Sequence, residues 1–179
     1  MWRSDHNRRV PDSQSAQALC RSCGLCCDGT LFATVPVRET DNIAAMAAAG
    51  IEVETRAAGR CFTQPCAAHT GRSCRVYDAR PSECREFRCK LLIDRESGEV
   101  DWPRAFERVG QALALKRAVT EELERAEPAL AGRPWAGLMK PWTNEDDPAG
   151  SPELRRKYAR ALVAMVSLAR YLDRHFRPN

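Results

Sequence analysis

Nine cysteines, all between residues 20 and 89, are the side chains of this sequence best suited to do chemistry. In a reducing compartment, thiols clustered in this way are more typical of metal binding or redox chemistry than of a disulfide scaffold. An odd number also leaves one thiol unpaired if the others form disulfides. The composition therefore favours a metal-binding protein, with buried or catalytic thiols as the simpler alternative.

The first cluster reads Cys20-Arg21-Ser22-Cys23-Gly24-Leu25-Cys26-Cys27. Two cysteines separated by two residues, such as Cys20 and Cys23, can present both sulfurs to one tetrahedral ion. Gly24 leaves room for backbone amides to turn toward the sulfurs. The spacing of Cys20, Cys23 and Cys26 also matches the ligand run of a bacterial-type ferredoxin. The spacing therefore permits either zinc or an iron–sulfur cluster.

The doublet Cys26-Cys27 is unusual because adjacent side chains diverge and rarely bind one mononuclear ion. On a helix, Cys26 would point roughly 120° away from Cys20, whereas Cys23 and Cys27 would lie within roughly 60° of it. Two metal centres, or one polynuclear centre, would use such a doublet. The simpler interpretation is one ligand beside one buried thiol.

The second cluster contains the other five cysteines: Cys61, Cys66, Cys74, Cys84 and Cys89. Residues 59–89 show little hydrophobic periodicity before Pro81, so something other than an apolar core must order them, and a bound metal can do so. A helix that begins at Pro81 would place Cys84 and Cys89 roughly 140° apart. Either that helix breaks, or the two thiols serve different sites.

Together these motifs resemble a known family. The pattern Cys20-x-x-Cys23-Gly24-x-Cys26-Cys27, then Gly59-x-Cys61, then Cys74-x-x-Tyr77-x-x-Arg80-Pro81-x-x-Cys84-Arg85-x-Phe87-x-Cys89 resembles the YkgJ or CxxCxxCC family of zinc- or iron-chelating domains. The resemblance covers roughly residues 20 to 92. It implies eight metal ligands: Cys20, Cys23, Cys26, Cys27, Cys61, Cys74, Cys84 and Cys89. Cys66 falls outside the pattern and is an extra candidate ligand. Flagellin lysine N-methylases look similar in this region, which favours an iron–sulfur cluster, although no S-adenosylmethionine site can be matched here.

Cations are expected around bound thiolates, because a zinc ion with four thiolates carries a net charge of −2 and is costly to bury alone. Arg80 and Arg85 belong to the matched segment, and we expect them to offset this charge and lower the sulfur pKa values. His69 could replace a thiolate as a ligand, but its position in a loop favours a surface histidine.

Charge and hydrophobicity indicate which partners the sequence does not favour. A net charge of +4, from 28 Lys and Arg against 24 Asp and Glu, does not favour a nucleic-acid partner. The sequence has no run approaching ~18 apolar residues and no apolar segment after its charged N-terminus, so we expect a cytoplasmic protein without a membrane partner. Phosphate-binding loops, nucleophile elbows and His-Glu-x-x-His motifs are lacking, which leaves enzyme activity undecided.

Short elements are predicted around the cysteines. Residues 13–19 predict the start of a helix that runs into the first cluster. Residues 31–37 predict a strand, and Pro36 favours a sheet edge or a strand end. Thr40 or Asp41 is expected to cap a helix over residues 42–49, and residues 51–55 predict a second strand.

Two amphipathic helices are predicted in the C-terminal half. The first begins after Asp101 and has the apolar stripe Phe106, Val109, Leu113, Val119 and Leu123. The second begins at Ser151 and has the stripe Leu154, Tyr158, Leu162, Met165, Leu168, Leu172 and Phe176. Between them, residues 129–150 predict an irregular connector whose Trp135 and Trp142 pack on the helices.

These elements predict an α+β fold, mostly α, in which a cysteine-rich, metal-ordered module with short strands packs on C-terminal amphipathic helices. Residues 1–17 are expected to be a flexible tail, residues 18–95 the metal-binding module, and residues 96–179 a helical segment of the same domain.

Three functions are compatible with this arrangement. The first is a metal-binding protein in which thiolates hold zinc or iron mainly to stabilise the fold. The alternative is an iron–sulfur redox component, or part of an enzyme that modifies a protein or peptide partner, with a [4Fe–4S] cluster on the same cysteines. The third is a thiol redox sensor that forms reversible disulfides.

Overall fold

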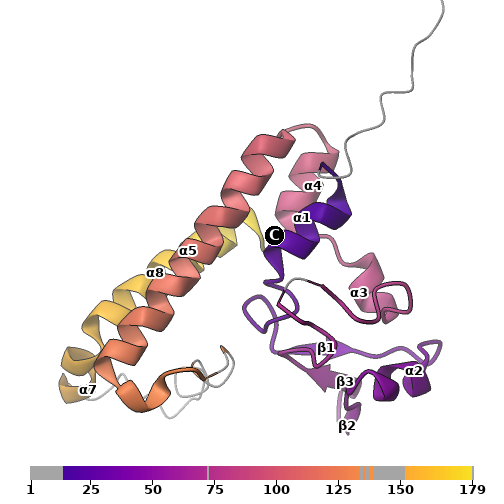
Figure 1. Ribbon diagram of the computed structural model, residues 1–179, viewed down its shortest axis with the longest axis horizontal. Helices are drawn as coiled ribbons and strands as arrows, with labels where there is room; N and C mark the ends of the chain where they lie inside the picture. The colour runs from indigo at the N-terminus through magenta and orange to yellow at the C-terminus, as the bar shows by residue number, and fades with distance from the viewer. Residues whose placement is uncertain (1–13, 72, 134, 136–137, 139–151, 179) are drawn as a thin grey trace, which may run out of the picture.

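A computed structural model describes residues 14–71, 73–133, 135, 138 and 152–178. It confirms the α+β, mostly α class, because helices dominate and the strands form one small sheet. In Figure 1, a long pair of helices extends to one side of the molecule and the sheet lies on the other. Most of the predicted tail, Trp142 and the predicted helix start at Ser151 lie outside the described residues.

The first helix, α1 (Ala16–Cys23), carries Cys20 and Cys23. It begins where the Ser15 hydroxyl accepts a hydrogen bond from the Ala18 amide at 3.1 Å. It ends at Gly24, whose φ of 67° lies in the left-handed region and whose amide donates to the Cys20 carbonyl. The predicted helix is therefore present, and the expected module boundary at residue 18 falls inside it.

The sheet is antiparallel, with the order β1-β3-β2. Its strands are β1 (Thr34–Pro36), β2 (Glu54–Arg56) and β3 (Gly59–Thr63). Pro36 lies on an edge strand, as predicted, where its missing amide removes no central hydrogen bond. The central strand β3 was not predicted, because glycine and cysteine hide its short apolar pattern.

Helix α2 (Ile43–Ala48) follows β1, and its cap corrects the prediction. The side chain of Asn42, rather than Thr40 or Asp41, accepts the hydrogen bond from the Ala45 amide at 2.9 Å. The Asp41 carboxylate instead accepts hydrogen bonds from the amide and hydroxyl of Ser82, at 2.8 and 2.7 Å. Asp41 thereby fixes the start of another helix.

That helix is α3 (Ser82–Glu86), and it is followed by α4 (Lys90–Glu96). The chain is extended at Phe87 and Cys89, so the helix predicted from Pro81 does break between Cys84 and Cys89. Cys84 therefore lies on α3, whereas Cys89 lies at the start of α4.

The long pair consists of α5 (Trp102–Ala126) and α8 (Ala159–His175). The Asp101 side chain caps α5 by accepting from the Arg104 amide at 2.8 Å, as predicted. A 3-10 turn, η1 (Pro128–Leu130), follows α5, and α7 (Pro152–Lys157) precedes α8. The second predicted helix is therefore divided at Tyr158.

Two apolar cores hold these elements together. The helical core unites α1, α4, α5 and α8 through the buried residues Leu19, Leu25, Leu91, Leu92, Val100, Ala105, Val109, Ala112, Val119, Leu123, Leu138, Ala161, Leu168, Leu172 and Phe176, with Trp135 packed against it. The sheet core contains Val35, Val37, Met46, Ala49, Ile51, Phe62 and Ala68. The predicted stripes of α5 and α8 thus meet each other, and the cysteine-rich module shares their core.

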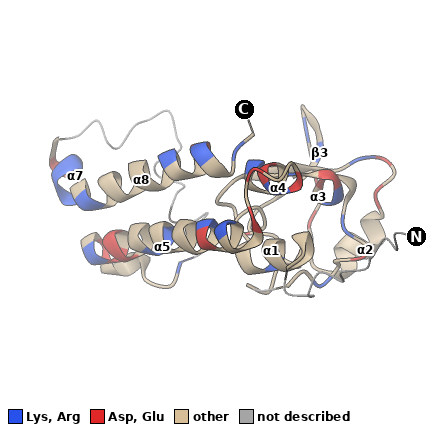
Figure 2. Cartoon of the chain, turned by 90° about the horizontal axis from the view of Figure 1, so that it is seen from above, with Lys and Arg blue, Asp and Glu red and all other residues tan. Residues whose placement is uncertain are grey.

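Charged side chains of both signs are distributed over the elements. Figure 2 shows Lys and Arg beside Asp and Glu on α3, α4 and α5, whereas α7 is mainly basic. Within the described ranges, no helix has the length and apolar character needed to cross a membrane.

Candidate metal centre

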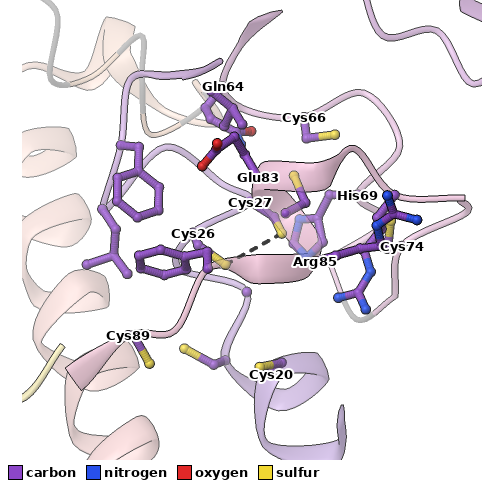
Figure 3. Close-up of a pocket in the computed structure, with 18 of the residues that line it drawn as sticks. Cys20, Cys26, Cys27, Gln64, Cys66, His69, Cys74, Glu83, Arg85 and Cys89 are labelled. Carbon is purple, nitrogen blue, oxygen red and sulfur yellow. Dashed lines mark hydrogen bonds between the residues drawn. The ribbon is translucent and has the colours of Figure 1, made fainter. Parts of the chain in front are cut away.

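One pocket, with a volume of about 310 Å³, is lined by eight of the nine cysteines. We call it the thiol pocket. Its thiols come from α1, the loop after it, the loop after β3, α3 and the start of α4 (Figure 3). They are Cys20, Cys23, Cys26, Cys27, Cys66, Cys74, Cys84 and Cys89. The structure thus brings together seven of the eight sequence-predicted ligands, together with Cys66.

Cys61 is the predicted ligand that does not line the thiol pocket. It lies on β3, paired with Pro36 on one side and Glu54 on the other. Its neighbour Phe62 is 1% exposed and lines both the sheet core and the pocket. Because successive strand residues face opposite sides of a sheet, Cys61 faces away from the pocket.

Cys66 takes a place in the pocket that the sequence motif did not assign to it. Its amide donates a hydrogen bond to the Cys27 carbonyl at 2.8 Å, which fixes the second cluster against the first. A sequence signal did exist, because Phe62 is the only large apolar residue of β3 and already implied that Cys61 faces the other way.

Backbone amides point at four of the sulfurs. Burial raises the pKa of Cys23 to about 12, and a hydrogen bond from the Leu25 amide opposes that rise. At three other thiols, burial likewise raises the pKa and backbone hydrogen bonds oppose the rise. The donors are the amides of Ala68 and His69 for Cys66, of Val76 for Cys74, and of Leu91 and Leu92 for Cys89. Such amides stabilise a thiolate, and they are typical of sulfurs that bind a metal. Gly24 makes the turn at Cys23, as the sequence predicted.

Burial keeps most of these thiols neutral in the absence of metal. It raises the pKa of Cys20 to about 11 and that of Cys84 to about 12. Although Cys20 is an exposed residue, its sulfur lies inside the pocket in Figure 3. A metal must therefore displace protons when it binds, and its affinity must increase with pH.

The pKa values of the adjacent thiols Cys26 and Cys27 shift in opposite directions. The sulfurs of Cys26 and Cys27 lie 3.8 Å apart. The hydrogen bond between these two thiols lowers the pKa of Cys27 and raises that of Cys26. One proton shared between the two sulfurs therefore makes it easier for the doublet to lose the other.

Arg80 supplies positive charge to the pocket. Its guanidinium stacks 3.7 Å from the centroid of the Tyr77 ring, and its Nε donates to the Tyr77 carbonyl at 2.8 Å. Burial raises the pKa values of Cys20, Cys74 and Cys84, and the charge of Arg80 opposes each rise. Arg85 also lines the pocket, but its guanidinium contacts the Ser82 hydroxyl at 3.3 Å.

His69 lines the same pocket instead of lying free on the surface. Its amide donates to the Cys66 carbonyl at 2.9 Å. A Cβ atom on Gly24 would lie 3.1 Å from Cε1 and Nε2 of the imidazole, so any other residue here would force His69 to shift. Nearby, Gln64 is 3% exposed, and its Oε1 has no hydrogen-bond partner among the described residues.

The donor set fits zinc or an iron–sulfur cluster, because thiolates are the soft ligands that both prefer. Within the described parts of the chain, no three Cys, His, Asp or Glu side chains are already gathered closely enough to hold an ion. To hold a metal ion, the sulfurs would have to move closer together than they lie here.

Comparison with known proteins gives one result. Residues 19–106 match the family CxxCxxCC, described as "Putative zinc- or iron-chelating domain". The matched range includes all nine cysteines. No curated protein and no solved structure matches the chain. The chain therefore carries, over residues 19–106, a region that matches the CxxCxxCC family.

Proposed function

We propose that this protein binds zinc or iron through the thiolates of the thiol pocket, and that the metal serves mainly to stabilise the fold. One observation carries the proposal: eight thiols from sequence segments that lie far apart line a single pocket. Thiols that converge from several segments on one pocket are typical of a metal site. Cys66 replaces Cys61 in the ligand set, because only Cys66 lines the pocket.

The position of the pocket between the two cores supports a structural role. Cys23 and Cys89 pack against the helical core, whereas Cys66, Cys74 and Cys84 pack against the sheet core. The sheet core contains few large side chains, and its strands have only three to five residues each. A metal that joined the thiols on the helical core to those on the sheet core would supply folding energy that the sheet and its core lack.

The number of thiols argues against hydrolysis. A zinc ion with four thiolates has no open position for water, whereas a catalytic zinc keeps one. Burial raises the pKa values of Cys20, Cys23 and Cys84, which does not favour these three thiols as the reactive thiolate of a redox sensor.

An iron–sulfur redox centre is the second candidate. The observation that favours it is the exposure of Cys20, which would bring a cluster on this thiol close to the surface of α1. Electron transfer to a protein partner requires such proximity, and amide hydrogen bonds to sulfur tune a cluster's potential.

The test is purification of the full chain without oxygen, followed by elemental analysis and a visible absorption spectrum. We expect zinc or iron bound to the folded protein. A colourless zinc protein would support the structural role, and brown iron–sulfur absorption would support the second candidate. Folded protein that contains neither metal would contradict both.

A further inference from the structure

The pocket thiols divide into two groups according to the core that they contact. Cys23 and Cys89 pack against the helical core. Cys66, Cys74 and Cys84 pack against the sheet core. The division follows the position of each thiol in the fold and not its position in the sequence. Cys84 and Cys89 are close in sequence, but the chain breaks between α3 and α4, and the two thiols belong to different groups.

Cys20 is assigned by its place on α1. It lies three residues before Cys23 on this helix, so the two side chains lie on the same helix face. The same helix contributes Leu19 to the helical core. Cys20 therefore belongs with the thiols of the helical core.

The doublet lies on the border between the groups. The Cys27 carbonyl accepts the Cys66 amide at 2.8 Å, which ties Cys27 to the sheet side. The sulfur of Cys26 lies 3.8 Å from that of Cys27. In Figure 3, Cys20 and Cys89 lie at one end of the pocket and Cys66 and Cys74 at the other, with Cys26 nearer the first end and Cys27 nearer the second.

We propose that the thiol pocket holds two metal centres with four cysteines each, and that the adjacent residues Cys26 and Cys27 contribute one sulfur to each centre. The first centre consists of Cys20, Cys23, Cys26 and Cys89. The second consists of Cys27, Cys66, Cys74 and Cys84. This inference rests on the proposed function and extends it to the number and composition of the sites.

Two features fit this division. Zinc and the common iron–sulfur clusters each accept four protein sulfurs, so eight thiols fill two sites without remainder. Each group also contains two thiols that accept backbone amides: Cys23 and Cys89 in the first, Cys66 and Cys74 in the second.

Arg80 is the cation that we place beside both centres. It lines the thiol pocket, where the ring and the carbonyl of Tyr77 hold its guanidinium. Two zinc ions with eight thiolates would carry a net charge of −4, so a cation shared between the centres reduces the repulsion between them.

The first test is titration of the reduced, metal-free full chain with Cd²⁺, followed by native mass spectrometry and ¹¹³Cd NMR. We expect two Cd²⁺ ions per chain and two resonances of the tetrathiolate type. Cys23→Ser or Cys89→Ser should remove one of these resonances, and Cys74→Ser or Cys84→Ser should remove the other. Cys61→Ser is the matched control and should retain both.

A second measurement does not depend on variants that fold. Wild-type chains that carry a single Cd²⁺ are treated with N-ethylmaleimide, and the protected cysteines are located by fragmenting the selected mass. The protected thiols should be those of one proposed centre in any given molecule. Mixed sets would overturn the division.

The outcomes separate this inference from the proposed function. A chain that binds neither zinc, iron nor Cd²⁺ contradicts the proposed function itself. A chain that binds metal at one site only, or in which Cys23→Ser and Cys74→Ser remove the same resonance, leaves the proposed function standing and overturns the two-centre division.

Discussion

At the scale of single residues, strand geometry decides which cysteines reach the thiol pocket. Cys61 and Cys66 lie close in sequence, but Cys61 follows the alternation of β3 and Cys66 follows the loop beyond it. The direction in which a thiol points therefore matters more than its place in the motif.

We predict that Cys66→Ser lowers the zinc or iron content of the purified chain to about half, because a site with three thiolates binds metal far more weakly than one with four. Cys61→Ser changes a residue of similar burial in the same segment and should retain full metal. Elemental analysis per folded chain measures both. Equal losses in the two variants would show that the pocket does not define the ligands.

Gly24 has a left-handed backbone conformation and lies directly against His69 in the thiol pocket. Gly24→Ala should lower the free energy of unfolding by at least about 1–2 kcal/mol, the cost of a left-handed residue with a side chain. The added Cβ would also lie 3.1 Å from the His69 imidazole and disturb the loop of Cys66. Urea unfolding and metal content are the measurements.

Gly98→Ala is the control for Gly24→Ala. Gly98 has a φ of 83°, but a Cβ added there would meet no atom of the described residues within 4 Å. This variant should show the backbone cost without loss of metal. If both variants lose metal equally, the contact between Gly24 and His69 has no role in the site.

At the scale of elements, Asp41 connects the start of α2 to the start of α3. It is 8% exposed and accepts hydrogen bonds from Arg38 and Ser82. Burial alone would raise its pKa, but these hydrogen bonds outweigh burial and lower the pKa. The helix that presents Cys84 is thereby held in place.

We predict that Asp41→Asn costs about 1–3 kcal/mol of stability at pH 7, because the buried negative charge is lost and the new NH₂ group cannot accept the hydrogen bond from the Arg38 amide. Since the folded-state pKa is below the unfolded value of ~3.9, the stabilisation is complete above about pH 5 and disappears as pH falls through the folded-state pKa. The gap between wild type and variant should therefore narrow between pH 7 and pH 3.5 in urea unfolding at constant free zinc. A gap that does not change, or the same cost in the exposed Glu39→Gln, would contradict this role.

At the scale of the whole molecule, the two cores differ in what supports them. Among the described residues, the helical core contains fifteen buried residues from four helices and the segments beside them, whereas the sheet core contains seven. Apolar burial therefore stabilises the helical pair α5 and α8, and we expect the sheet lobe, the sheet with its core and loops, to depend on the proposed metal link through the thiols.

We predict that removing the metal with a chelator loosens the sheet lobe and leaves α5 and α8 largely folded. Amide hydrogen exchange should accelerate over residues 24–27 and 59–89, while the amides around Val119 and Leu172 stay protected. Reloading with zinc should restore the protection. Uniform acceleration along the chain would mean that the metal stabilises one cooperative unit and not this lobe.

Local sequence determined much of this protein. The apolar stripes of α5 and α8, the Asp101 cap, the edge position of Pro36 and the turn at Gly24 follow from interactions between residues a few positions apart, so each was predictable. The concentration of cysteines likewise identified metal chemistry, because the residue type itself limits what the thiols can bind.

Only the tertiary structure decided which thiols meet. The unpredicted strand β3 turns Cys61 away, the Cys27 carbonyl holds Cys66 in the pocket, and the break before Cys89 separates it from Cys84. These outcomes depend on contacts between segments that are distant in sequence. The sequence shows how many cysteines there are and which local turns they make. The packing of the two cores around one pocket determines which cysteines lie together.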